Sequence, residues 1–230
     1  MQLILIRHGQ PGWATEDGAA VFDPGLTTRG RRQAESVAER LARWEEPIDE
    51  LYVSTATRAR ETAAPVADRL GLEPKIEEWL HEIRLPEHWD GTPAEEVGRV
   101  LREARVRPRD EWWDGLADGE SFRDFHHRVT TGLGAALTSW GVTRHNDDPE
   151  HLWHVAREDQ RIAIVAHAGT NSVVIGYLLG LEPQPWEWER FASDHASVTV
   201  LQTAPIASGW IWGLQRFSDV AHHAAGDVTI

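Results

Sequence analysis

The segment from Leu3 to Gly9 constrains the fold more than any other stretch of the chain. Four consecutive apolar residues, 3–6, are typical of a short strand that is buried on both faces of a parallel sheet. Arg7 and His8 follow the strand, and Gly9 allows a sharp turn after them. Ligands of open α/β sheets bind just beyond the carboxyl ends of the strands. A permanent cation beside an imidazole at that point indicates a phosphate site, with His8 able to act as a nucleophile or proton carrier.

Composition limits the classes of partner. The 230 residues fit a single α/β domain, and the net charge of −14 argues against a nucleic acid or an anionic membrane surface as partner. The chain has no cysteine, which excludes disulfides and thiolate metal sites. The first apolar run is too short for a signal peptide, and no run approaches the ~20 apolar residues of a membrane span. We therefore expect a cytoplasmic protein.

Hydrophobic periodicity predicts strands that alternate with helices. After the first strand, Thr27 or Thr28 opens an amphipathic helix, residues 48–53 form a strand, and the next helix ends at Gly71. This order predicts an α/β fold of three layers, with a doubly wound, mostly parallel sheet. The later predicted elements are a strand at 74–77, a helix from Ser121 to Gly141, a strand at 161–166, a helix at 171–179, and strands at 197–202 and 210–214.

Two segments interrupt this pattern within an expected single domain, 1–230. Residues 79–118 are irregular and rich in tryptophan, and we expect them to form a cap with a functional role. Residues 142–160 are polar, and we expect a surface insertion; the tail around His222 and His223 is expected to be loosely attached. The 142–160 segment also contains potential metal ligands, although a solvated loop is the favoured interpretation. These ligands are His145, His151, His154, Asp147 and Asp148.

Basic residues follow three of the predicted strands. Arg7 and His8 end the first, Arg58 lies at the start of the helix after the second, and His167 ends the strand at 161–166. Because parallel strands end at one edge of a sheet, we expect these side chains to meet there. Arginine forks and helix N-termini both favour phosphate.

Five motifs, taken in this order and spacing, resemble the histidine phosphatase family of the phosphoglycerate-mutase-like superfamily, in the branch with an Arg-His-Gly motif. The resemblance covers nearly the whole chain. The motifs are Leu5-Ile6-Arg7-His8-Gly9, Leu26-Thr27-Thr28-Arg29-Gly30 with Gln33-Ala34, Ser54 with the run from Thr57 to Ala63, Gly119-Glu120-Ser121, and Val165-Ala166-His167-Ala168-Gly169.

The resemblance implies a role for each matching residue. His8 would be the nucleophile that takes up the phosphoryl group, with its other ring nitrogen donating to a backbone carbonyl. Arg7, Arg58 and a protonated His167 would clamp the phosphoryl oxygens, and Glu82 would be the general acid, although Glu77, Glu78 and Glu87 lie nearby. Phosphate contacts from Gln10, Trp13 and Ala168 are also expected.

Two departures from the family pattern indicate which branch of the family the chain resembles most. The run Gln10-Pro11-Gly12-Trp13-Ala14 lacks the Asn that often contacts phosphate, which argues against a strict mutase. Ala168 follows His167, where the acid phosphatase and phytase branch carries Asp.

The function expected from these residues and from the resemblance is that of a metal-independent phosphomonoesterase that acts through a phosphohistidine, without a cofactor, on small phosphorylated metabolites. A cofactor-dependent phosphoglycerate-type mutase is one alternative, and a catalytically silent phosphoryl-binding protein is another. The expected partners are a small phosphate ester and inorganic phosphate as product. Edge strands with Trp210 and Trp212 would allow a homodimer. The aromatic character of 79–118 favours apolar or aromatic leaving groups.

Overall fold

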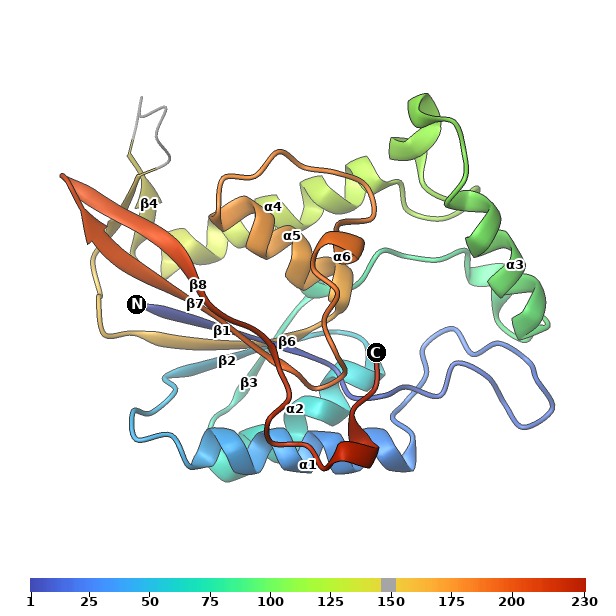
Figure 1. Ribbon diagram of the computed structural model, residues 1–230, viewed down its shortest axis with the longest axis horizontal. Helices are drawn as coiled ribbons and strands as arrows, with labels where there is room; N and C mark the ends of the chain where they lie inside the picture. The colour runs from blue at the N-terminus through green and yellow to red at the C-terminus, as the bar shows by residue number, and fades with distance from the viewer. Residues whose placement is uncertain (146–151) are drawn as a thin grey trace.

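An eight-stranded sheet forms the centre of the molecule (Figure 1). The computed structural model describes residues 1–145 and 152–230. The strand order is β3-β2-β6-β1-β7-β8-β5-β4. Helices cover both faces of the sheet, which confirms the predicted α/β class with three layers.

Four strands form the parallel half of the sheet. They are β1 (Gln2–Arg7), β6 (Arg161–Ala166), β2 (Glu50–Ser54) and β3 (Pro74–Glu77). The predicted apolar runs are buried on both faces, because residues 3–6 and 162–166 are at most 1% exposed. The parallel register of β1 and β6 places Arg7 beside Ala166. His8 and His167, the next residue of each strand, therefore leave the sheet side by side.

The other four strands are antiparallel, so the sheet is mixed where the sequence predicted mostly parallel strands. They are β7 (Val198–Ile206), β8 (Gly209–Asp219), β5 (Trp153–Val155) and β4 (Val142–Arg144). β7 pairs with β1 and forms a long hairpin with β8. The two strands extend past their expected ends at 202 and 214, where Ile206 and Phe217 are exposed and periodicity carries no burial signal.

The expectation that residues 142–160 form only a surface insertion is wrong. Val142, Trp153 and Val155 are buried, because β4 and β5 continue the antiparallel half of the sheet. The candidate metal ligands His145 and His154 lie in or beside these strands. His151, Asp147 and Asp148 lie outside the described residues.

Two pairs of helices form the outer layers. They are α1 (Thr28–Ala42) with α2 (Thr57–Leu70) on one face, and α4 (Phe122–Ser139) with α5 (Ala168–Leu178) on the other. Thr27 caps α1 and Ser121 caps α4 as predicted, since each side chain accepts a hydrogen bond from the backbone three residues later. α5 begins three residues earlier than expected. In the described part of the chain, no helix has the length and apolar character needed to cross a membrane.

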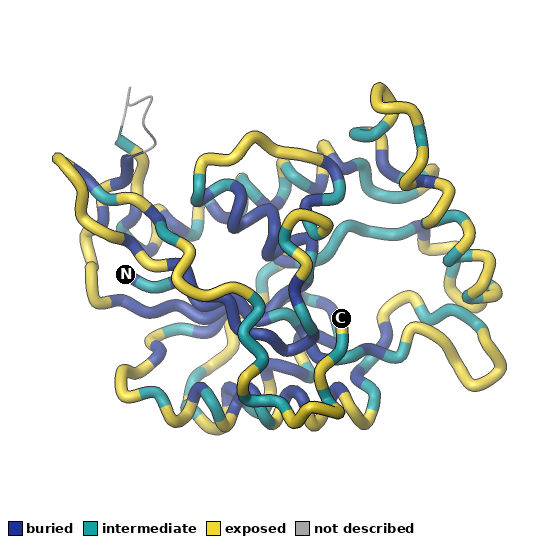
Figure 2. The backbone as a smooth tube through the Cα atoms, viewed as in Figure 1, coloured by how far each residue is buried: buried dark blue, intermediate teal, exposed yellow. Residues whose placement is uncertain are grey.

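Strand β1 divides the core between the two faces. Ile4 and Ile6 pack with α1 and α2, whereas Leu3 and Leu5 pack with α4 and α5, as the alternation of side chains along a strand requires. Figure 2 shows the resulting buried centre inside an exposed shell. Both helical layers therefore pack against the apolar side chains of the same strand, β1.

The predicted cap segment, 79–118, consists of short helical pieces. They are η1 (Glu78–Leu80), η2 (Glu87–Trp89), α3 (Ala94–Ala104) and η3 (Arg109–Asp114). The segment contacts the loop that follows β1, because Ala20 N donates to Thr92 O and Gly91 N donates to Ala20 O. In Figure 1, α3 stands at the side of the molecule next to that loop.

The end of the chain is bound to α1, contrary to the loose attachment expected. Asp227, in the short helix η4 (Ala225–Asp227), pairs with Arg32 at 2.6 Å. Arg40 Nη1 donates to His222 Nδ1. The Nε2 atoms of His222 and His223 donate to the carbonyl oxygens of Ala196 and His195. The contacts with Arg32 and Arg40 join residues 195 and 182 positions apart, which local patterns cannot reveal.

Trp212 does not form the exposed surface expected of a dimer contact. It is 5% exposed and packs in the core with Trp153, and Trp210 packs against the same cluster. The homodimer stays a prediction.

A pair of glycines in α4 tests the packing of the cap against the helices. A Cβ at Gly132 would overlap the Cβ and Cγ atoms of Trp79, whereas a Cβ at Gly134 meets nothing within 4 Å. Alanine favours a helix over glycine by about 1 kcal/mol, but overpacking costs about 1–3 kcal/mol. We expect Gly134→Ala to raise the free energy of unfolding in urea and Gly132→Ala to lower it. Equal effects of the two changes would contradict this packing.

Candidate active site

Five predicted site residues meet at the carboxyl ends of the parallel strands. Arg7 and His8 end β1, Arg58 lies in the first turn of α2 after β2, and His167 is the N-cap residue of α5 after β6. Glu82 comes from the segment after η1. The His8 and His167 ring centroids lie 5.1 Å apart. The convergence predicted from the strand order is therefore present.

His8 is oriented by its own backbone neighbour. Its Nδ1 lies 2.8 Å from Gly9 O, which can only accept, so Nδ1 carries the ring proton and Nε2 holds a lone pair. The residue is 4% exposed. Burial, together with the charges of Arg58 and Arg7, holds the pKa of His8 well below its usual range. The ring is thus neutral and prepared for attack through Nε2.

Gly9 is required for close approach rather than for the sharp turn expected from the sequence. It does not have a positive φ, but a Cβ there would lie 2.6 Å from Gly30 O in the first turn of α1. Gly9 N donates to Thr62 Oγ1 of α2 at 2.9 Å. These contacts fix the turn that carries His8 between two helices.

His167 is neutral in this site, not protonated as expected. Burial is the main cause, and the charge of Arg58 adds to it; both hold the pKa of His167 well below its usual range. Its Nε2 lies 2.7 Å from Ser54 Oγ, whose oxygen also accepts from Ala56 N. In the described residues the Ser54 hydroxyl makes no other hydrogen bond in which it can donate, so we assign its proton to the bond with Nε2, which places the ring proton on Nδ1.

Each arginine is held by the protein through only part of its guanidinium group. Arg7 Nη1 donates to Ser193 O and Nη2 lies 3.2 Å from His195 Nε2. Arg58 Nη1 lies 3.5 Å from Asp23 Oδ1, and its guanidinium stacks 4.8 Å from the centre of the Trp13 ring. Burial lowers the pKa of Arg7 to about 10, which leaves the group charged at neutral pH.

Three donors of this cluster lack a partner. Arg7 Nε, Arg58 Nε and His167 Nδ1 are buried without a hydrogen-bond acceptor in the described part of the chain. Leaving such groups unpaired is costly, and an anion with several oxygens offers acceptors of the kind that they lack. The N-termini of α2 and α5 add positive potential at the same place. The arrangement is suited to a phosphoryl group.

Glu82 lies at the N-terminus of α5. Its Oε2 accepts from Gly169 N at 2.9 Å and its Oε1 accepts from Ile83 N at 3.0 Å. Its charge acts on both Arg7 and Arg58. Of the neighbouring carboxylates, Glu78 pairs with Arg84 at the surface instead. Glu82 is thus the acidic side chain of the cap segment that the fold brings to the arginines.

The remaining predicted phosphate contacts are placed differently. Trp13 covers Arg58, and Ala168 is the first residue of α5. Gln10 Oε1 instead accepts from Thr27 Oγ1 at 3.0 Å, and Gln10 N donates to Gln33 at 2.7 Å. Gln10 is therefore held at the start of α1.

Two residues of the site carried no signal in the sequence analysis. His195, before β7, lies 5.6 Å from His8 between ring centroids. Asp23 accepts from Thr57 N and Oγ1 and so caps α2, whose own N-cap residue, Ala56, has no side chain to do so. Both come from loops that lie outside the five motifs. In the described residues, no group of three or more His, Cys, Asp or Glu is placed to hold a metal ion.

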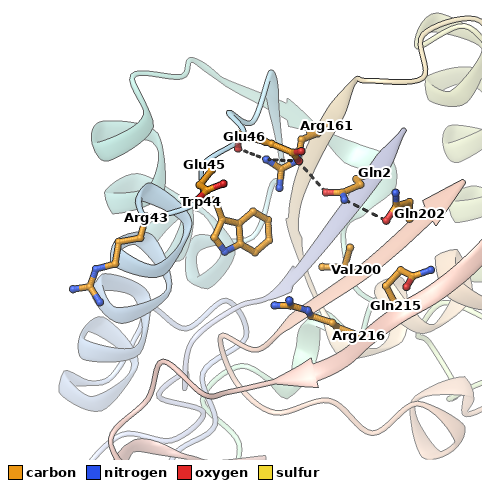
Figure 3. Close-up of a pocket in the computed structure, with 10 residues that line it drawn as sticks. All are labelled: Gln2, Arg43, Trp44, Glu45, Glu46, Arg161, Val200, Gln202, Gln215 and Arg216. Atoms are coloured by element: carbon orange, nitrogen blue, oxygen red, sulfur yellow. Dashed lines mark hydrogen bonds and ion pairs between the residues drawn. The ribbon is translucent and has the colours of Figure 1, made fainter.

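A hollow of about 520 Å³ lies at the other end of the parallel strands, where β1 and β6 begin (Figure 3). It contains Arg161 at the amino-terminal end of β6. The protein itself occupies this arginine: Nε donates to Gln2, Nη1 donates to Glu46 O, and the guanidinium lies 5.0 Å from the centre of the Trp44 ring. Arg161 therefore differs from Arg7 and Arg58. In the described residues, none of its nitrogen atoms is buried without a hydrogen-bond partner.

Comparison with known proteins agrees with this geometry. A family model described as "Histidine phosphatase superfamily (branch 1)" matches residues 3–210. A probable phosphoglycerate mutase, GpmB, of Enterobacter sp. (strain 638) is 27% identical, over 96% of this chain and 94% of its own. The solved complex of a mycobacterial glucosyl-3-phosphoglycerate phosphatase with inorganic phosphate is 26% identical, with a TM-score of 0.68 over 97% of this chain and 99% of that one. The alpha-ribazole phosphatase of Shigella flexneri, 24% identical with a TM-score of 0.70 over 95% of this chain and 96% of its own, shares the fold.

Acidification is expected to destabilise the protein, because His8, His167 and His195 are buried in the neutral form. The unfolded chain binds a proton at each near pH 6.5, whereas the folded chain binds it only at lower pH. The free energy of unfolding therefore falls by up to about 1.4 kcal/mol per pH unit for each histidine below pH 6.5. Urea unfolding at pH 7.5 and 5.5 measures this loss.

A variant sharpens the measurement. His195→Asn removes one of the three buried histidines and is expected to reduce the pH dependence of the free energy of unfolding. His88→Gln, which removes an exposed histidine, is the control. The same pH dependence in wild type and His195→Asn would contradict the assignment.

Proposed function

The chain belongs to the histidine phosphatase superfamily (branch 1), and from that premise we propose that it hydrolyses phosphate monoesters of small metabolites through a phosphohistidine at His8, without a metal. The observation that carries the proposal is the trio of unpartnered buried donors, Arg7 Nε, Arg58 Nε and His167 Nδ1, around a neutral His8. These donors have no acceptor within residues 1–145 and 152–230, and the oxygens of a phosphoryl group would supply acceptors for them.

In the first step, His8 Nε2 attacks phosphorus as the bond to the leaving oxygen breaks. Arg7, Arg58 and His167 stabilise the charge on the three other oxygens, mostly by being fixed in place beforehand. Glu82, which must first take up a proton, gives that proton to the leaving oxygen, which departs as an alcohol. The phosphoryl group is then bound to His8.

In the second step, the Glu82 carboxylate takes a proton from water. The water oxygen attacks phosphorus and the bond to His8 Nε2 breaks, which releases inorganic phosphate and restores both residues. Splitting one displacement into two in this way is the advantage of covalent catalysis. The arginines supply the positive charge that a metal would otherwise supply.

An apolar pocket beside the site indicates the substrate class. It has a volume of about 300 Å³ and lies between α3 and the loop after β1. Its larger lining residues are Trp13, Phe22, Leu85, Trp89, Val97 and Leu101. Trp13 belongs to the pocket and also covers Arg58, so the pocket adjoins the proposed phosphate position. We propose that it takes an apolar or aromatic leaving group.

The same pocket bears on the mutase alternative suggested by the names of several relatives. A mutase must hold a bisphosphorylated sugar acid, whose second phosphate needs cationic partners. The pocket wall instead consists of apolar residues. This favours hydrolysis of an apolar ester over transfer of the phosphoryl group between positions of a sugar acid.

Hydrolysis of an aryl phosphate in excess EDTA tests the central proposal. We expect turnover that EDTA does not reduce, and a loss of about 10⁴-fold or more in His8→Ala, because the nucleophile is removed. Turnover that survives in His8→Ala would exclude His8 as nucleophile. Isomerisation of 3-phosphoglycerate in a coupled assay, without hydrolysis, would favour the mutase, and phosphate binding without either activity would favour the silent binding protein.

The substrate class is tested by shortening a wall of the pocket. Trp89→Ala is expected to lower kcat/KM for a naphthyl phosphate by about 10–100-fold, through lost apolar contact, and to leave glycerol phosphate nearly unaffected. Val106→Ala, at an exposed position in the same segment, is the matched control. An equal loss for both esters would remove the pocket from substrate recognition.

A further inference from the structure

His195 has no part in the chemistry proposed above, yet it is buried in the site. It is 6% exposed and lies before β7, and the next residue, Ala196, donates from its backbone N to His8 O at 3.2 Å. The His195 ring lies 5.6 Å from that of His8 between centroids. A buried polar ring in a charged site needs a reason for its position.

The hydrogen bonds of His195 run in one direction. A guanidinium group can only donate, so Arg7 Nη2 donates to His195 Nε2 at 3.2 Å. The ring proton of His195 is then on Nδ1, which donates to Thr229 Oγ1 at 3.0 Å. Burial and the charge of Arg7 lower the pKa of His195 to about 3, which keeps the ring neutral and able to accept.

Thr229 is itself fixed by two further contacts. Its Oγ1 accepts from Gln33 Nε2 at 2.9 Å, and its backbone O accepts from His195 N at 2.8 Å. Gln33 also donates to Asp227 O and accepts from Gln10 N, two residues beyond His8. In Figure 1 the end of the chain returns over α1 to the middle of the molecule. The final residues thus connect Arg7 to α1 and back to the loop after His8.

This connection determines where Arg7 points. The guanidinium is planar, so fixing Nη1 on Ser193 O and Nη2 on His195 also fixes the direction of Nε–H. Nε is the Arg7 donor that has no partner in the described part of the chain. Its alignment matters because a donor that is already aimed at the phosphoryl oxygens needs no reorganisation during the reaction.

We propose that His195 and Thr229 are positioning residues that hold Arg7 with its Nε–H aimed at the phosphoryl group, so that the last residues of the chain complete the phosphate clamp. The inference rests on the proposed phosphate site. It adds that phosphate binding there depends on a segment more than 200 residues from Arg7 in the sequence. His195 and Thr229 act through Arg7 and need not touch the substrate.

Thr229→Val and Thr229→Ser test the proposal as a pair. Valine has nearly the shape of threonine but no acceptor for His195 Nδ1–H, whereas serine retains the hydroxyl. We expect Thr229→Val to lower both kcat for an aryl phosphate and the affinity for inorganic phosphate by about 10–100-fold, and Thr229→Ser to stay near wild type. Ile230→Ala, at the neighbouring exposed residue, is the control for changes at the chain end.

Two further readouts separate positioning from a merely structural role. The Nε–H signal of Arg7 in NMR is expected to shift on addition of inorganic phosphate in wild type and in Thr229→Ser, and to shift less in Thr229→Val. Thermal unfolding without phosphate is expected to show every variant fully folded at the assay temperature, although Thr229→Val unfolds at a lower temperature because His195 Nδ1–H loses its acceptor. A loss of kcat that only follows a loss of folded protein would overturn the proposal.

The outcomes distinguish this proposal from the proposed function. If wild type hydrolyses aryl phosphate and Thr229→Val matches it in kcat, phosphate affinity and the Arg7 signal, the positioning role is wrong and the phosphatase stands. If no variant hydrolyses any ester but Thr229→Val weakens phosphate binding relative to Thr229→Ser, the positioning role stands and the phosphatase is wrong.

Discussion

Arg58 is buried and Arg7 is half-buried beside two imidazoles at one end of the sheet, and the rest of the site follows from how their charge is accommodated. A buried cation is costly unless it is paired and hydrogen-bonded. The protein supplies only part of that pairing, through Ser193, His195 and the more distant Asp23. We propose that an anion supplies the rest. Burial, with the same charge added to it, holds the pKa values of His8 and His167 well below their usual range, so both rings are neutral. In the function that we propose, this arrangement would both bind the phosphoryl group and leave His8 able to attack it.

The location of this charge depends on strand direction. Parallel pairing of β1, β6 and β2 brings the ends of three distant segments to one edge, and each end continues into a turn or helix that carries a basic side chain. The antiparallel half contributes differently: the loop before β7 supplies His195 and the carbonyl that holds Arg7. A chain with a net charge of −14 thus concentrates cations locally, because topology and not composition decides which charges meet.

Most of the fold could be predicted because its signals are local. The run 3–6, the strand at 161–166 and the caps at Thr27 and Ser121 each depend on a few neighbouring residues, and each is found where expected. Predictions failed where burial was decided from outside the segment. Residues 142–160 read as polar, yet β8 and β5 pair there and bury Trp153. The tail around His222 carries no apolar pattern and is held by charge and hydrogen bonds to α1 instead.

The sequence by itself determined the α/β class, the family, and the strand ends where Arg7, His8, Arg58 and His167 would meet, because these follow from periodicity and from motifs of fixed spacing. The protonation state of His167, the reason for Gly9, the position of Gln10 and the link from Arg7 through His195 to Thr229 were decided only by the tertiary structure. Each of these depends on distances between segments remote in the chain. Burial and through-space charge set a pKa or aim a donor, and neither can be read from the order of the residues.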